Sequence, residues 1–376
     1  MTVRGRTLDR PAFGAGPTFA VGAEEELLLV DGISGELSGS APETLKRGHW
    51  SPGRAVPEIC QSVIEFVTPV CASPAEAVDV LSTLRWQAAQ AGSTLLGAGV
   101  HPNGQFGDVA LTPGARYDAV AASLGGLLRR TPHCGLHVHV GMPDAETGVR
   151  ALNGMRKWLP MLIALGANSP FWYGCDSELA SARTVIAHSL PRSGPPPVFR
   201  DYDHYRSTVN AVVSAGELID FREIWWDARL QPSLGTLEMR ALDAQSSVRD
   251  VAGLIALVQC LAVYEAQAPA EPGPPAEILD ETIFRAFRDG RAARLYFEGE
   301  LRPLPEIVEE AVRRGGTLAR DLNCECELAE ALRMARHGNG ADRQRERFAQ
   351  GGMAGLLRSL AGETARSASP AAPVAA

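Results

Sequence analysis

The 376-residue sequence lacks any apolar run long enough to cross a membrane. The longest run, from Val251 to Tyr264, contains Gln259 and is shorter than the roughly 20 residues that a spanning helix needs, so it is typical of a buried helix. The first residues are charged up to Arg10 and show no apolar core of a secretory signal. We therefore expect a cytoplasmic protein that does not bind membranes.

The sequence also lacks paired cysteines and a positive charge excess. Its seven cysteines form no CxxC pair, which is typical of a reducing compartment. Lys and Arg number 36 against 44 Asp and Glu, a net charge of −8, and no basic stripe stands out. A nucleic-acid surface is therefore not expected, because such a surface needs cations to neutralise phosphates. Polyphosphates could still bind through metal ions and a few arginines.

What is present is an ordinary globular composition with 45% hydrophobic residues, enough to bury a full core in one large domain or two. Residues 1–17 are rich in Arg, Gly and Pro, and we expect a flexible lead-in. The Ala/Ser/Pro-rich residues 364–376 are expected to be disordered. A single domain over residues 18–363 is the expected organisation.

Three consecutive glutamates interrupt an apolar run that has the composition of a buried strand. Side chains alternate along a strand, so Glu24 and Glu26 share a face, about 7 Å apart, whereas Glu25 points away. Two acids on one buried face repel each other unless a cation lies between them or they stay protonated. A strand end with solvated acids remains the alternative.

Further strand-like segments carry the same kind of anomaly. In the run 56–69, Glu65 lies among β-branched and aromatic residues, and Glu58 precedes it by seven positions. The segment 133–141 places His137 and His139 on one face, a pattern suited to aiming two imidazoles at one metal or one phosphate.

Two later segments supply arginines. Residues 181–197 contain four prolines and are expected to form neither a helix nor a central strand. Arg183 and Arg192 on such a stiff loop could bind phosphate or carboxylate. A plain surface loop is the alternative. Residues 225–229 and 235–243 are expected to form a hairpin with Glu238 and Arg240 on one face.

An antiparallel sheet with one buried face could bring these acids, histidines and arginines together on its other face. Carboxylates with histidine and no cysteine suit Mg²⁺ or Mn²⁺ better than structural zinc, and several converging acids imply more than one ion. Metal ions beside arginines suggest phosphoryl transfer. The sequence has no GxxxxGK[ST] loop, so the nucleotide site would be built on the sheet.

Helical patterns alternate with these strands. Ser73 and Pro74 open a helix that runs to about residue 91, and further helices are expected over 145–168, 201–215 and 246–267. After a proline-rich linker at 268–275, helices are expected to dominate up to residue 350, where they would cover the sheet or make dimer contacts. The fold class is therefore α+β.

Six motifs in this order resemble the type 2 glutamate-cysteine ligase family, also called carboxylate-amine ligases. They are Gly22-x-Glu24-x-Glu26, Glu58 followed by Glu65, Gly135-x-His137-Val-His139-Val-Gly141, Arg183 with Pro191-x-x-Gly194, Trp226-Asp227-x-Arg229 and Gly235-Thr-x-Glu238-x-Arg240-x-x-Asp243.

The resemblance implies a fold similar to the catalytic domain of glutamine synthetase, a curved, mainly antiparallel sheet flanked by helices. It implies ATP and Mg²⁺ (or Mn²⁺) as cofactors. The implied reaction joins L-glutamate and L-cysteine to γ-glutamylcysteine with release of ADP and phosphate, through an acyl phosphate. The alternatives are the same chemistry on another acid and amine, or a nucleotide-binding dimer that no longer catalyses.

The resemblance also implies a role for each motif residue. The partners would be a small-molecule acid and amine, and the enzyme would be a homodimer. The implied metal ligands are Glu24, Glu26, Glu65, His137 and Glu238; the catalytic residues are His139, Arg183 and Arg240; and the residues that bind substrate or ATP are Glu58, Arg192, Trp226, Asp227 and Arg229.

Overall fold

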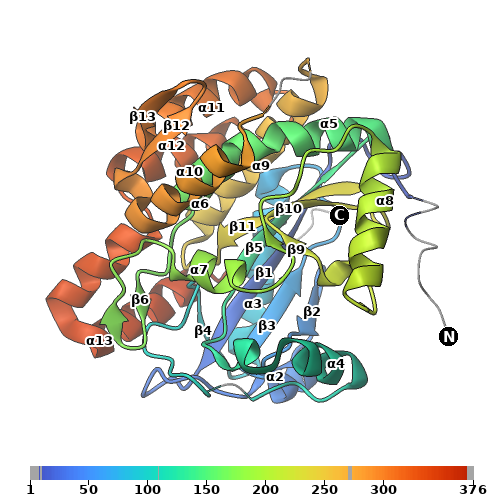
Figure 1. The fold of residues 1–376 in the computed structure, drawn as a ribbon. Helices are drawn as coiled ribbons and strands as arrows, with labels where there is room; N and C mark the ends of the chain where they lie inside the picture. Colours follow the sequence, from blue (N-terminus) through green and yellow to red (C-terminus); the bar gives the residue numbers. More distant parts are fainter. Residues whose placement is uncertain (1–7, 9–10, 109, 270–272, 371–376) are drawn as a thin grey trace, which may run out of the picture.

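The computed structural model describes residues 8, 11–108, 110–269 and 273–370. Its centre is a seven-stranded sheet in which every pair of neighbours is antiparallel (Figure 1). The expected fold class, an antiparallel sheet flanked by helices, is confirmed. The strands follow the order β10 (Ala228–Gln231), β11 (Thr236–Asp243), β5 (Gly135–Gly141), β1 (Val21–Val30), β3 (Val63–Val67) and β2 (Arg54–Pro57), and β4 (Thr94–Leu96) also pairs with β1.

The register of the sheet explains why acids distant in sequence meet. Glu24 lies opposite His137, and Glu26 lies opposite Glu65. On the next strand, Glu238 lies opposite His139. Directly opposite residues in a sheet share a face, so one face collects these side chains although they come from four strands.

The opposite face of the sheet is the hydrophobic core. Leu27, Val138 and Met239 are fully buried there. Helices α3 (Pro74–Gln90), α5 (Ala145–Met155), α6 (Leu159–Leu165) and α9 (Val248–Gln267) contact the sheet, and α9 is apolar almost all round because it lies in the core of the molecule.

Glu25 points into this core, where it has a partner that the sequence did not reveal. Arg85 of α3 donates from Nε to Glu25 Oε2 at 2.9 Å, and its Nη2 pairs with Glu25 Oε1. The same guanidinium donates to the carbonyls of Gln245 and Ser246. A buried charge is tolerated when it is paired and hydrogen-bonded, so Glu25 fixes α3 to β1.

The other helices surround the sheet. In Figure 1, α2 and α4 lie together at its lower end, and α10 to α12 form a separate group at the upper left. Their bounds are α2 (Ala41–Arg47), α4 (Ala115–Leu124), α7 (Ala182–His188), α8 (Tyr202–Ala215), α10 (Ala276–Asp289), α11 (Leu304–Ala319), α12 (Glu325–His337) and α13 (Gly340–Arg366), with 3-10 turns η1 (Gly125–Arg129), η2 (Arg156–Trp158), η3 (Phe221–Glu223) and η4 (Gly290–Ala292).

Two expectations about local structure are wrong. The run 56–69 is two strands, β2 and β3, joined by a turn that carries Glu58. Residues 182–188 form helix α7, because the first proline comes only at Pro191 and Ser181 caps the helix by accepting a hydrogen bond from Thr184 N. Helices dominate the C-terminal part as expected, with one hairpin, β12 (Arg294–Phe297) and β13 (Glu300–Pro303), among them.

Three small strand pairs lie outside the main sheet. They are β12 with β13, β6 (Phe171–Trp172) with β7 (Cys175–Asp176), and β8 (Ser193–Gly194) with β9 (Trp225–Trp226). Within the described residues, no helix combines the length and the apolar composition that crossing a membrane requires.

Parts of the terminal segments that were expected to be flexible or disordered are ordered in the structure. Ala12 N donates to Pro232 O at 2.8 Å and Gly14 N donates to Met142 O at 3.0 Å, so the lead-in is attached from residue 12 onward. Helix α13 extends to Arg366, three residues past the expected boundary, and Ser369 N donates to Ser82 Oγ. The remainder of the expected tail, residues 371–376, lies outside the described residues.

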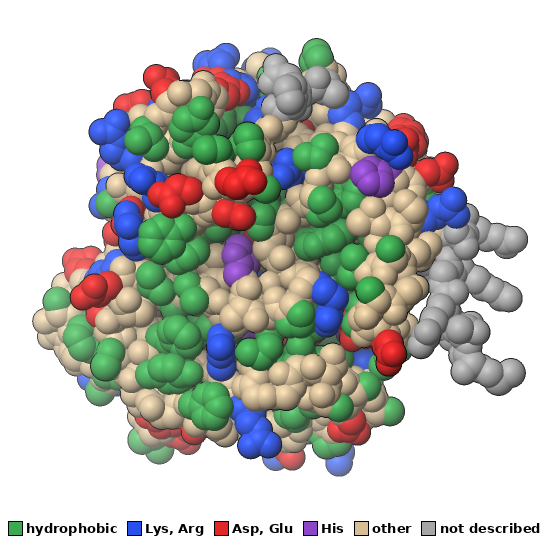
Figure 2. Space-filling view, viewed as in Figure 1, with side chains coloured by type: hydrophobic (Ala, Val, Ile, Leu, Met, Phe, Trp, Pro, Cys, Tyr) green, Lys and Arg blue, Asp and Glu red, His purple; other side chains and the backbone are tan. Residues whose placement is uncertain are grey.

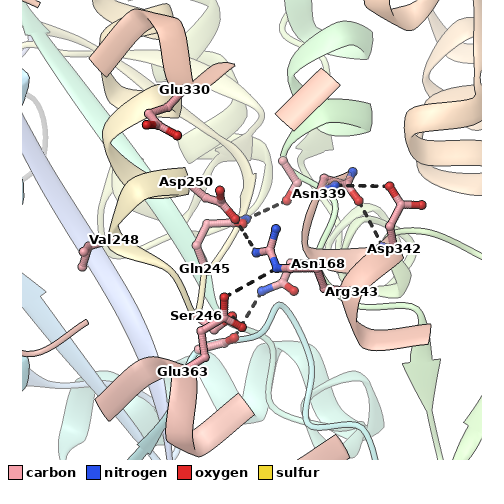
Figure 3. A network of polar contacts seen from close by, with 12 residues as sticks. Asn168, Gln245, Ser246, Val248, Asp250, Glu330, Asn339, Asp342, Arg343 and Glu363 are labelled. Atoms are coloured by element: carbon pink, nitrogen blue, oxygen red, sulfur yellow. Dashed lines mark hydrogen bonds and ion pairs between the residues drawn. The ribbon is translucent and has the colours of Figure 1, made fainter. Parts of the chain in front are cut away.

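A polar network ties the C-terminal helices to the core (Figure 3). Asp250 of α9 is fully buried and pairs with Arg333 of α12 and Arg343 of α13. Ser246 donates to Glu363 at 3.1 Å. The carboxylate of Asp250 therefore holds two consecutive helices whose arginines lie 83 and 93 positions further along the chain.

Replacing Asp250 with asparagine is expected to lower the free energy of unfolding by about 2 kcal/mol, because two arginines lose their buried partner while both remain partly open to water. Urea denaturation followed by circular dichroism measures the change. Glu309→Gln is the matched control: its ion pair with Arg336 is exposed, so it should change stability by less than about 0.5 kcal/mol. Equal stability of the two variants would contradict the role of the network.

Candidate active site

Glu24 lies at the centre of the charged face of the sheet. His137 Nδ1 is 3.2 Å from Glu24 Oε2, and His139 Nε2 is 3.4 Å from Glu24 Oε1. His137 Nε2 also lies 3.8 Å from Glu26 Oε1. One carboxylate thus lies between two imidazoles from the neighbouring strand. Alternation predicted that the two imidazoles share a face, and the pairing of β1 with β5 brings Glu24 between them.

Three groups of side chains on this face have the spacing of metal ligands. In each group, the candidate ligand atoms lie within 4.8 Å of one another. Glu24 belongs to two groups and Glu65 to two, so the groups are contiguous along the sheet. They are Glu24, His139 and Glu238; Glu24, Glu65 and His137; and Glu26, Glu58 and Glu65.

Glu238 is held by two arginines. Arg229 donates from Nε to Glu238 Oε2 at 2.7 Å, and Arg240 pairs with Glu238 Oε1. The ladder between β11 and β5 shifts register after Met239, and this irregularity places Arg240 Nη1 3.5 Å from His137 Nδ1. Burial acts to raise the pKa of Glu238, but the two guanidinium groups outweigh it and hold this pKa well below its usual range.

The carboxylates divide into two electrostatic groups. Burial acts to raise the pKa of Glu24, but contacts with His137 and His139 hold it well below its usual range. At the other end, burial and the charge of Glu58 raise the pKa of Glu26 to about 7. Burial also raises the pKa of Glu58 and, with the neighbouring glutamates, that of Glu65. The charges of the nearest arginines do not offset burial at this end.

These residues fit divalent cations. The donors are carboxylate oxygens and imidazole nitrogens, the set that suits Mg²⁺ or Mn²⁺. His139 Nδ1 contacts Thr236 Oγ1 at 3.0 Å, whereas its buried Nε2 has no hydrogen-bond partner among the described residues. A buried donor set of this kind, with repelling acids and an unsatisfied ring nitrogen, indicates a place for cations.

Arg183 reaches the site from the start of α7. Asp243 at the end of β11 accepts hydrogen bonds from Ser169 Oγ and Ser181 Oγ, and Ser169 Oγ accepts one from Arg183 N. The guanidinium donates from Nη2 to Arg240 O at 3.1 Å and passes directly over Gly135, where an added Cβ would lie 2.3 Å from Nη2. The sequence predicted Arg183 but not this support by Asp243.

Comparison with known proteins assigns the chain to a family. The model of glutamate-cysteine ligase family 2 matches residues 20–363. The chain belongs to this family. The enzyme class, an ATP-dependent ligase, follows from this membership.

Relatives agree with this assignment. A protein of Rubrobacter xylanophilus named "Putative glutamate--cysteine ligase 2-3" is 39% identical to the enzyme over 362 residues, covering 94% of this chain and 99% of that protein. A protein of Gloeobacter violaceus named "Putative glutamate--cysteine ligase 2" is 36% identical over 345 residues, which cover 88% of this chain and 92% of that protein.

Solved structures support the fold. A glutamate–cysteine ligase of Francisella tularensis in complex with AMP matches with a TM-score of 0.70 and 12% identity over 93% of this chain and 89% of that one. A bifunctional glutathione synthetase of Pasteurella multocida matches with a TM-score of 0.70 and 13% identity over 93% of this chain and 52% of that one. At such low identity, the match shows the fold alone.

Two cavities of the enzyme meet the charged face. The larger, about 660 Å³, is lined by Glu26, Glu58 and Glu65 and by arginines that include Arg183 and Arg240. The smaller, about 410 Å³, is lined by glycines and apolar side chains, with His139 and Thr236 on its wall. Glu24 lines both, so the cation groups lie where the cavities meet.

The remaining predicted residues lie around the larger cavity. Asp227 and Arg229 line it, and Asp227 also contacts His188 Nε2 at 2.9 Å. Trp226 is buried against Phe199 and does not line the cavity; the neighbouring Trp225 lines it instead. Arg192 lies over the ring of Trp225, 5.2 Å from its centroid.

Sequence reasoning missed several residues of the cavity, among them Arg116 and Tyr117 of α4. No periodic signal marks them, because they reach the cavity only through the packing of α4 against the turn at Glu58. On the face shown in Figure 2, basic and acidic side chains are interspersed and form no continuous basic patch.

Proposed function

We propose that the enzyme forms an amide from a carboxylic acid and an amine through an acyl phosphate, with L-glutamate and L-cysteine as the default pair. The substrate carboxylate attacks the γ-phosphorus of ATP and releases ADP. The amine nitrogen then attacks the acyl carbon, phosphate leaves, and the amine loses a proton. The observation that carries this proposal is the contiguous row of cation-binding groups at the junction of two chemically different cavities.

The two cavities suit different substrates. The smaller cavity has an apolar, glycine-rich wall in which Gly22 has no neighbour closer than 3.8 Å to an added Cβ, so a flat base can lie close to the backbone. We assign ATP to it, with the phosphates toward Glu24 and His139. The larger cavity holds the arginines and is assigned to the acid and the amine. The AMP bound by the Francisella tularensis ligase supports a nucleotide site in this fold.

The residues have distinct roles in this proposal. Glu24, Glu26, Glu65, His137 and Glu238 hold Mg²⁺ or Mn²⁺. When bound, these ions neutralise phosphate charge and polarise the γ-phosphoryl group. His139 contacts the transferred phosphoryl group through Nε2, the ring nitrogen that faces Glu24. Arg183 and Arg240 bind phosphate or the substrate carboxylate, since guanidinium binds both in bidentate fashion. Glu58 holds the incoming ammonium group.

ADP release in a matrix of acids and amines tests the proposal. We expect ADP to form only when both an acid and an amine are present together with ATP and Mg²⁺. Turnover without an amine would contradict amide formation. Tight ATP binding without any turnover in the matrix would favour the non-catalytic dimer.

We further propose one catalytic domain over residues 18–363 in a cytoplasmic homodimer. All seven cysteines are free in the structure, as expected in a reducing compartment. Light scattering of the purified enzyme measures the assembly state, and a monomer at working concentration would contradict this part of the proposal.

The affinity for Mg²⁺ is expected to fall as the pH falls. Cation binding needs ionised carboxylates, and Glu26, with a pKa near 7, holds a proton at pH 6 that the cation must displace. The dissociation constant of Mg²⁺ should therefore be about tenfold higher at pH 6 than at pH 8. Calorimetric titration in two buffers of different ionisation enthalpy measures the affinity and the released protons. Equal affinity at both pH values, with no proton release, would contradict the raised pKa.

A further inference from the structure

The larger cavity has a second wall that the proposed reaction does not use. Besides the acids and arginines, this cavity is lined by aliphatic side chains from α4, η1, α7 and the residues just after α7. We call this set the aliphatic wall. It consists of Val120, Leu124, Leu127, Leu128, Ile186 and Leu190.

The aliphatic wall is fixed at the acidic end of the cavity. Tyr117 Oη donates to Pro57 O at 2.8 Å, and Thr112 N donates to Ile59 O at 2.9 Å, so the segment that leads into α4 is anchored on both sides of Glu58. At the other end, Arg130 Nη1 donates to Ser189 Oγ at 2.7 Å and joins η1 to α7. The aliphatic wall therefore extends from the segment beside Glu58 to the end of α7.

This placement combines two attractions for one substrate. Glu58, the carboxylate at this end of the cavity that is not assigned to a metal ion, attracts an ammonium group. Leu127, Leu128 and Leu190 are only partly buried, so a bound apolar group can still remove their surface from water. Cysteine carries only one methylene and a thiol and would leave most of this surface exposed.

We propose that the amine substrate carries an aliphatic or aromatic group of several carbons, and that this group lies against the aliphatic wall while its nitrogen lies near Glu58. This inference rests on the proposed amide-forming reaction and replaces its default amine, cysteine, with an amine of this class. The cavity volume of about 660 Å³ lies within the range of roughly 300–1,000 Å³ typical of sites that enclose drug-sized ligands, so such a group has room.

A homologous series of amines tests the inference without knowledge of the acid. Ethylamine, propylamine, butylamine and pentylamine are titrated into the full chain with Mg²⁺ and ADP, with L-cysteine as reference. The dissociation constant is expected to fall about fourfold for each added methylene. Pentylamine should then bind about 60-fold more tightly than ethylamine and more tightly than cysteine. A flat series, binding of cysteine ahead of pentylamine, or no binding of any amine would overturn the inference.

Two variants test whether the dependence of affinity on amine length arises at the aliphatic wall. Leu128→Gln places an amide in the aliphatic wall at a partly buried position, and it should flatten the series with little change in melting temperature. Leu301→Gln is the matched control, because Leu301 is exposed on β13 and does not line the cavity; it should leave the series unchanged. An equal effect of the two variants would also overturn the inference.

The preference for an apolar amine and the proposed ligase function can fail independently of each other. If ADP release depends on an amine but affinity does not change along the amine series, the ligase function stands and only the preference for an apolar amine is contradicted. A steep series without ADP release for any acid would keep the binding site and contradict amide formation.

Discussion

Glu238→Gln is expected to abolish turnover and to destabilise the fold by about 3–5 kcal/mol. Glu238 is 1% exposed and is the shared partner of Arg229 and Arg240, so a neutral amide leaves two guanidinium groups beside each other with no carboxylate between them. The lowered pKa of Glu238 reflects the same attraction, because the arginines favour its charged form. Chemical denaturation and ADP release measure the two effects.

Glu26→Gln is the contrasting variant. It should also lose metal-dependent turnover, but at pH 8 its melting temperature should equal or exceed that of the wild type. The pKa of Glu26 is about 7, above its usual 4.5, so ionisation of Glu26 costs stability at pH values above 7, and the cost disappears as the pH falls below 4.5. The amide oxygen of the variant side chain can still accept the hydrogen bond that Gly135 N donates to Glu26 Oε2 at 2.6 Å. Equal destabilisation by both variants would contradict this division of the carboxylates.

The difference between the two acids marks what the sequence could and could not predict. Strand periodicity placed Glu24, Glu26, His137 and His139 on one face, because alternation is a local property of the backbone. Alternation also placed Arg240 on the same face as Glu238, but nothing local indicated that Arg229 would pair with Glu238 as well, or that Glu26 would form no ion pair with an arginine among the described residues. Such pairing depends on which strands become neighbours.

The same limit applies to the residues that support the site. Glu25 and Arg85 are 60 positions apart, and their buried pair exists only because α3 packs on the back of β1. Arg229 was predicted to bind substrate or ATP from its motif; in the structure its guanidinium already pairs with Glu238, and substrate contact by it stays a prediction.

The local structure around Arg183 was predicted wrongly, although Arg183 lines the cavity. The prolines of the segment suggested a stiff loop around Arg183, but they begin at Pro191, beyond the end of the helix at His188. The serine cap at Ser181, held by Asp243, starts the helix and directs Arg183 toward the sheet. In this segment the capping serine therefore indicates the local structure better than the nearby prolines do.

Gly135→Ala is expected to reduce the catalytic rate about 100-fold without unfolding the protein, because a displacement of catalytic groups by about 1 Å costs that much. The added Cβ would lie 2.3 Å from Arg183 Nη2 and 3.0 Å from its Cζ, so the guanidinium must move. The backbone can stay in place, since the clash involves the far end of a flexible side chain. ADP release and the melting temperature are the two measurements.

A double-mutant cycle separates this displacement from a general disturbance of β5. Arg183→Lys should lose a similar factor, because lysine cannot make the bidentate contact of a guanidinium. If Gly135 acts through Arg183, the double variant should be hardly slower than either single variant. Multiplied losses in the double variant would show that the alanine acts on another part of the site, such as the hydrogen bond from Gly135 N to Glu26.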